Sequence, residues 1–157
     1  MNRSRTACTG LLLLVTVIVA AADLRIETAF TRYYTDEGIL PIADYFRDAV
    51  PGQSFRTVVS SDPEKPAGQY FIMRLKGGTG KGTIARARMT LYATDSKEPR
   101  EEEWDLEGID PRKWLYLGIT GTDWPGEAVQ PLAWRIRLLD TTGGILAEWK
   151  SFLWEQP

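Results

Sequence analysis

A glycine-rich stretch with one lysine is the first place in this 157-residue chain to look for phosphate chemistry. It spans Gly77–Thr83 and reads GGTGKGT. A phosphate-binding loop needs a glycine five residues before its Gly-Lys pair, a Ser or Thr after the lysine, and a helix that begins there. Leu75 and Gly82 occupy those two positions, and a strand pattern begins at Ile84. We therefore predict a hairpin loop between two strands and no nucleotide binding.

Nucleophile and metal chemistry lack their usual side chains. The chain has no histidine, and its one cysteine, Cys8, lies in the N-terminal segment. Ser-His and Cys-His catalysis need a histidine base, and zinc, copper and haem sites use histidine or cysteine. Calcium needs only oxygen ligands, but Asp105, Glu107 and Asp110 lack the spacing of a known calcium loop. We predict no cofactor and no metal.

An acidic stretch is the remaining candidate for catalysis. Its members are Glu101, Glu102, Glu103, Asp105 and Glu107. Two carboxyl groups can hydrolyse a glycosidic bond, one as acid and one as base or nucleophile. Residues 95–110 are expected to form a long polar connection, in which solvent keeps carboxyl pKa values near normal. A small carboxylate-based hydrolase is therefore a minor alternative, and we expect that the protein is not an enzyme.

Tryptophan is the residue type that offers the clearest candidates for ligand contact. The six tryptophans are Trp104, Trp114, Trp124, Trp134, Trp149 and Trp154. Trp134 and Trp149 fit strand patterns and are expected in the core. Trp104 and Trp124 fall in expected loops and Trp154 near the end of the sequence, so these three are possible ligand-contact aromatics. Exposed, they would suit stacking on sugars or hot spots for a protein; the alternative is that they plug the ends of the fold.

The N-terminal segment has the pattern of a signal peptide. Basic residues in Asn2–Arg5 precede the apolar run Leu11–Val19, and Ala20–Ala22 supplies small residues for cleavage near Ala22. We predict export to the periplasm or the extracellular space, with no stable membrane insertion after cleavage. The alternative is an uncleaved anchor, although the uncharged stretch Thr6–Ala22 is at the short limit for spanning ~30 Å of hydrocarbon.

Size and charge limit the fold and the partners that residues 23–157 can have. We expect these residues to form a single domain. The whole chain carries a net charge of −2, and removal of the basic residues Arg3 and Arg5 makes it more acidic. Without a basic excess, nucleic acid is not an expected partner. Without cysteine after Cys8, the domain must be held by its core alone, which is feasible at this length.

Alternation of apolar and polar residues predicts about seven strands. They cover residues 23–34, 54–60, 70–75, 84–94, 113–120, 132–138 and 145–150. The last two form a hairpin, because the glycines of Asp140–Gly144 can adopt positive φ. One short helix is expected at Pro41–Val50, with proline in its first turn. The apolar end Phe152–Trp154 is expected to pack within its own chain, with contact to another chain as the alternative.

These strands favour an all-β, antiparallel two-layer sandwich. It resembles immunoglobulin and fibronectin type III domains in architecture only, since no cysteine pair is present to support the relation; a small β-barrel is the alternative. The expected function is an interaction module that binds another envelope or secreted protein. A carbohydrate-binding module that uses exposed tryptophans is the second hypothesis.

Overall fold

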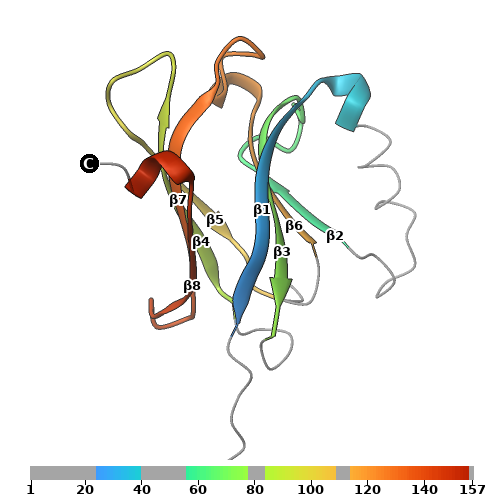
Figure 1. Ribbon diagram of the computed structural model, residues 1–157. Coiled ribbons are helices and arrows are strands. Elements are labelled where there is room, and N and C mark those ends of the chain that lie inside the picture. The colour runs from blue at the N-terminus through green and yellow to red at the C-terminus, as the bar shows by residue number, and fades with distance from the viewer. Residues whose placement is uncertain (1–23, 40–55, 78–83, 109–113, 156–157) are drawn as a thin grey trace, which may run out of the picture.

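The chain forms a two-layer β-sandwich in the computed structural model, which describes residues 24–39, 56–77, 84–108 and 114–155 (Figure 1). Sheet A has the order β1-β3-β6-β2 and sheet B the order β5-β4-β7-β8. The strands are β1 (Arg25–Tyr34), β2 (Arg56–Ser60), β3 (Gly68–Lys76), β4 (Arg86–Ala93), β5 (Arg100–Asp105), β6 (Trp114–Thr120), β7 (Pro131–Leu139) and β8 (Ile145–Lys150). Two short 3₁₀ helices follow β6 and β8, namely η1 (Gly121–Asp123) and η2 (Phe152–Glu155). The predicted all-β sandwich is confirmed.

Three predicted features lie outside the described residues. They are the signal peptide at 1–22, the helix at 41–50 and most of the glycine-rich loop at 77–83. Its flanking strands are described, however, and they correct one expectation. Strand β3 belongs to sheet A and β4 to sheet B, so the chain crosses between the sheets here and does not form a hairpin.

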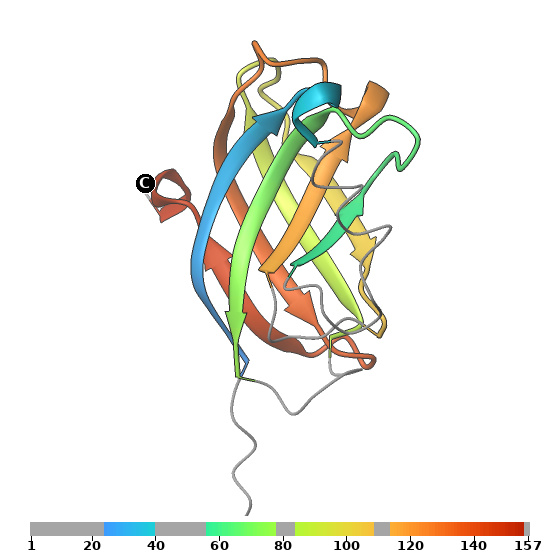
Figure 2. The same cartoon turned by 90° about the vertical axis from the view of Figure 1, so that its right-hand side faces the viewer.

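Pairing is antiparallel in both sheets with one exception. Strand β2 runs parallel to β6, with Val58 opposite Tyr116. The reason is the loop at 61–67, which passes over the end of β6, so that β2 and β3 flank β6 and run in opposite directions (Figure 2). The predicted hairpin of β7 and β8 is present, and Gly143 in its turn adopts φ +86°.

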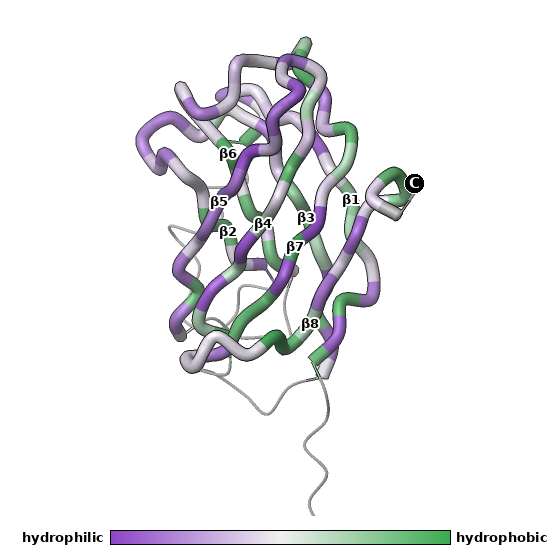
Figure 3. The backbone as a smooth tube through the Cα atoms, turned by 90° about the vertical axis from the view of Figure 1, so that its left-hand side faces the viewer, coloured by the Kyte–Doolittle hydropathy of each residue, from purple (hydrophilic) through white to green (hydrophobic). Residues whose placement is uncertain are grey.

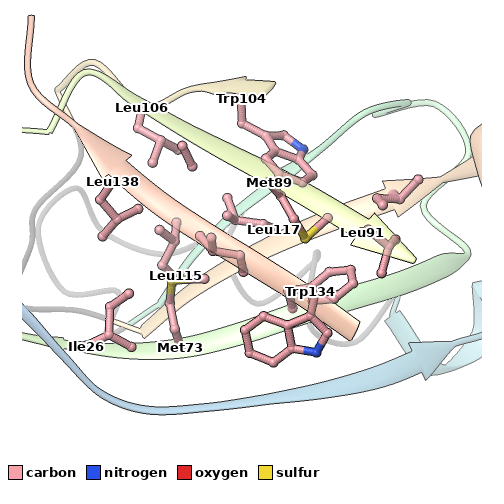
Figure 4. Packing of buried hydrophobic residues seen from close by; sticks show 14 of the residues in the cluster. Ile26, Met73, Met89, Leu91, Trp104, Leu106, Leu115, Leu117, Trp134 and Leu138 are labelled. Carbon is pink, nitrogen blue, oxygen red and sulfur yellow. The ribbon is translucent and has the colours of Figure 1, made fainter. Parts of the chain in front are cut away.

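The main core fills the space between the two sheets (Figure 4). Each central strand contributes alternate residues, as the period-two patterns predict. The fully buried contributors from β4, β6 and β7 are Ala87, Met89, Leu91, Leu115, Leu117, Ile119, Ile136 and Leu138. Phe71 of sheet A meets Trp134 of sheet B edge to face, with 5.7 Å between ring centroids. The sandwich is therefore held by apolar contact across its midplane.

The outer face of sheet A carries a second apolar cluster, with Ile39, Tyr70, Ile72 and Tyr116 buried. Both faces of β3 are therefore apolar, which explains its continuous apolar run. The Tyr70 hydroxyl donates a hydrogen bond to the Pro66 carbonyl at 2.8 Å, and burial raises the pKa of this phenol to about 12.

Strand β1 changes face in its middle. The alternation predicts Leu24, Ile26, Thr28 and Phe30 on one side, but a register shift between Ile26 and Thr28 interrupts the pairing with β3. After this bulge, Ala29 and Tyr33 pack against the main core, whereas Phe30 points outward against Trp114. An inserted residue in one strand reverses the inside and outside positions that follow it.

Strand β5 replaces part of the polar connection predicted at 95–110. Its acidic sequence does not predict a strand, because Trp104 is the only residue of β5 that belongs to the main core. The outward Glu103 accepts hydrogen bonds from Arg86 and Arg88 of the neighbouring strand β4. Cross-strand charge pairing and one buried aromatic anchor thus make an acidic segment into an edge strand.

Substitution of Gly68 with alanine should destabilise the sandwich. A Cβ at this position on the central strand β3 would lie 2.2 Å from the Ile119 carbonyl oxygen, and a backbone atom inside a sheet cannot move aside cheaply. We expect Gly68→Ala to lower the free energy of unfolding by ~2 kcal/mol or more in urea titrations. The control is Gly38→Ala, whose Cβ would lie 3.3 Å from the Thr35 hydroxyl oxygen; an equal loss there would contradict the explanation.

Candidate functional site

The three tryptophans predicted to contact a ligand occupy three different environments. Trp104 is 4% exposed between the sheets, where its indole N–H donates to the Gly118 carbonyl at 3.3 Å, so no ring face is open to a ligand (Figure 4). Trp124 is 3% exposed, but it lines a cleft at one end of the sandwich. Trp154 is half-buried on the short helix η2. The structure does not bring these three residues together.

Exposed apolar side chains gather around η2. They form what we call the C-terminal aromatic patch, made of Phe152 and Leu153 together with the Trp154 ring and the Tyr92 ring that it contacts. Phe152 is 80% exposed and Leu153 53%. The expected packing of this apolar end within its own chain is therefore incomplete. Figure 3 shows η2 as an apolar segment near the C-terminus, beside sheet B, whose strands alternate between polar and apolar residues.

Ser151 fixes η2 against strand β7. Its backbone N–H donates to the Trp134 carbonyl at 2.9 Å, and its hydroxyl oxygen accepts the Trp134 N–H at 3.0 Å. The Trp154 N–H then donates to the Ser151 carbonyl at 3.1 Å and closes the turn. Because the turn is anchored on both sides of the serine, the patch is held in place before any partner arrives.

Trp154 also connects the patch to the outer face of sheet B. Its ring lies 6.0 Å from the Tyr92 ring and 4.8 Å from the guanidinium carbon of Arg135. An arginine over an indole face is attracted by the ring's negative charge distribution. The patch therefore has an aromatic centre and a cationic border.

The second candidate surface is a cleft of about 670 Å³ at the opposite end of β1 from the N-terminus. We call it the loop-end cleft. Its lining residues are Tyr33, Asp36, Glu64, Lys65, Pro66, Ala67, Gly121, Thr122, Trp124, Pro125 and Gly126. Among the described residues, the charged groups of Asp36, Glu64 and Lys65 form no ion pair. Their hydrogen-bonding capacity faces solvent.

A network of hydrogen bonds preforms one wall of this cleft. The buried Thr120 hydroxyl donates to the Asp62 carbonyl at 2.9 Å and accepts the Asp62 N–H at 3.0 Å. The Asp62 carboxylate accepts the N–H groups of Glu64 and Lys65. In the same region, the Trp124 indole nitrogen is buried with no hydrogen-bond partner among the described residues. An unpaired buried donor is rare and invites an acceptor.

The acidic residues considered for hydrolysis do not converge on one point. Glu101 and Glu103 project from the outer face of sheet B, where Thr90 and the β4 arginines donate to them. Glu102 lies on the opposite face of β5, the side of Trp104. Burial, and secondarily the negative charge of Asp123, raises the pKa of the Glu102 carboxyl. The five residues of this stretch therefore do not form an acid–base pair.

Comparison with known proteins identifies no relative. Searches among protein families, curated proteins and solved structures found no match to this chain. Within the described ranges, no helix has the length and apolar character needed to cross a bilayer.

Replacement of Glu102 by glutamine should stabilise the protein at neutral pH. Because the folded-state pKa is raised, the native state holds this proton more tightly than the unfolded chain does, and stability falls as pH rises above the ordinary value of 4.5. We expect Glu102→Gln to unfold at higher urea concentration than wild type at pH 7.5, with the gain disappearing near ~pH 4. A gain that is equal at both pH values would rule out deprotonation of Glu102 as the cause.

Proposed function

We propose that this chain is an exported, non-enzymatic interaction module that docks a partner protein through the C-terminal aromatic patch. The observation that carries the proposal is the 80% exposure of Phe152 beside the half-exposed Leu153, on a turn that Ser151 holds in place. Isolated exposed apolar residues are common on protein surfaces, but a group of neighbouring apolar residues that includes three aromatic rings is typical of binding surfaces.

The energetics favour burial of this patch by another molecule. Transfer of a phenylalanine side chain out of water contributes about 2 kcal/mol. Aromatic anchors that are already ordered lose little conformational entropy on binding. The Arg135–Trp154 contact at 4.8 Å further restricts the anchor. The patch thus supplies the ordered aromatic centre that a protein interface requires.

Export rests on the N-terminal sequence. A basic start, the apolar run Leu11–Val19 and three small residues ending at Ala22 form the expected order of a signal peptide. The resulting location, periplasmic or extracellular, is consistent with a domain stabilised by its core and free of cysteine. A partner would then be another envelope or secreted protein.

Site-specific crosslinking tests the proposal. A photoreactive phenylalanine analogue placed at position 152 in the full chain should crosslink to a discrete protein in the native host, and Leu153→Ser in the same chain should reduce the yield several-fold. The matched control places the same probe at Ile145, which is 58% exposed at the distant β7–β8 turn. Equal crosslinking from both positions, or none from 152, would contradict docking through the patch.

A saccharide is the second candidate ligand, and a separate observation favours it. The loop-end cleft combines the Tyr33 ring, the carboxylates of Asp36 and Glu64, and the ammonium of Lys65, none of them in an ion pair within the described residues. Carboxylates and ammonium groups can bond sugar hydroxyls while an aromatic ring packs on the C–H face. The volume of about 670 Å³ is sufficient for a short oligosaccharide.

Binding of neutral trisaccharides tests this second candidate. We expect β-1,4-linked glucose or N-acetylglucosamine trimers to shift the Trp124 indole N–H resonance, and Glu64→Gln to weaken binding about tenfold by removing a charged acceptor. Glu98→Gln is the control, since Glu98 is exposed but does not line the cleft. If no trimer shifts the Trp124 signal, or if both variants bind equally well, the cleft is not a saccharide site.

A further inference from the structure

We infer that the outer face of sheet B holds an anion subsite centred on Arg135, which receives a carboxylate side chain from the protein that docks on the C-terminal aromatic patch. The identity of the occupant rests on the proposed function. The subsite itself rests on the register of the strands, on the partners of each arginine and on a shallow depression between them.

Strand register concentrates positive charge at the centre of this face. Arg88 of β4 stands directly opposite Arg137 of β7, and Thr90 stands opposite Arg135 in the next outward-facing row. Like charges that face each other across a strand pair are destabilising. A sandwich under selection for stability alone has no need of three arginines in adjacent positions, so their clustering points to a ligand of opposite charge.

Two of the three arginines are partly neutralised by the outer strands. Glu103 on β5 accepts two hydrogen bonds from Arg88, at 2.8 and 3.0 Å. Glu148 on β8 accepts one from Arg137 at 2.9 Å. In this row, which runs from β5 to β8, two central arginines are therefore flanked by one glutamate on each outer strand. These pairs position the central guanidinium groups without covering them.

Arg135 has no such partner. Among the described residues, its contact is the ring of Trp154, and it forms no hydrogen bond or ion pair. A guanidinium group carries five N–H donors in a planar fork that matches a carboxylate. Within the described residues, none of these donors is used in a hydrogen bond. Arg135 is therefore a fixed cation with unused donors at the border of the patch.

A depression of about 210 Å³ lies where these groups meet. It is lined by Arg88, Thr90, Glu101, Arg135 and Arg137. The three guanidinium groups outnumber the single carboxylate of Glu101, which already accepts a hydrogen bond from Thr90 at 3.2 Å. The lining is thus net positive, and its volume is below that of typical small-molecule pockets, so the depression can receive a side-chain carboxylate but not an oligosaccharide.

Arg135 belongs to both surfaces, which defines the chemistry of the partner. An apolar side chain seated on Phe152 and Trp154 would place a neighbouring acidic side chain over the depression. The expected partner segment therefore combines a large apolar residue with Asp or Glu one or two positions away. A basic segment would meet unpaired positive charge and is disfavoured.

Matched dipeptides test the subsite without the natural partner. The probes are N-acetyl-Phe-Glu-amide and its uncharged equivalent N-acetyl-Phe-Gln-amide, and binding is followed by the Trp154 indole and Arg135 Nε–H resonances of the full chain. We expect the glutamate probe to bind about fivefold or more tightly, and Arg135→Gln to abolish that preference. Arg86→Gln is the control, because Arg86 lies on the same face but outside the depression.

Three results would overturn the subsite: equal affinity for the two probes, no binding of either, or an unchanged preference in Arg135→Gln. Titration with acetate and sulfate distinguishes a site for a side-chain carboxylate from a site for free anions. If sulfate saturates the site and the glutamate probe binds no more tightly than the glutamine probe, the inference is also contradicted. Crosslinking from position 152 reports the proposed function separately. If crosslinking persists unchanged in Arg135→Gln, docking stands and the anion subsite fails. If the wild-type chain prefers the glutamate probe but shows no crosslinking from position 152, the subsite stands and docking through the patch fails.

Discussion

Apolar contact across the midplane is the interaction on which every other feature of this protein depends. No disulfide is available after residue 8, so Phe71 against Trp134 and the leucines around them must hold the two sheets together. This core fixes the direction of every side chain on the central strands. Because alternate residues are committed to the interior, the outward positions of β4 and β7 are free to carry charge.

The two outer faces use that freedom differently. Sheet A turns an apolar cluster outward, with Tyr70 and Ile72 each 1% exposed, so its outer face belongs to the fold. Sheet B turns arginines and glutamates outward and has the exposed turn η2 at its border. On such a face, unpaired charges and exposed aromatic rings are available to contact another molecule. The outer face of sheet B is therefore the better candidate for binding a partner.

The sequence predicts the strands with strong alternation because burial alone determines them. β4, β6 and β7 lie where their patterns indicate, and Trp134 faces the core as expected. β5 was missed because its stability comes from pairing with the arginines of β4, a contact between distant residues that alternation does not encode. The face reversal in β1 was missed for a similar reason, since a bulge is a property of the paired strands and not of one segment.

The candidate surfaces were less predictable, since they arise from register. Trp154 was identified from its place near the end of the sequence, but its alignment with Tyr92 and Arg135 requires that β4, β7 and η2 meet. The same register that brings Arg88 opposite Arg137 brings Arg135 beneath the indole ring. Adjacent like charges and an exposed aromatic ring such as Phe152 are both unfavourable in an isolated domain. A single ligand with an apolar and an anionic group would relieve both at once, and this coincidence is the strongest physical reason to treat the patch and the arginine cluster as one surface.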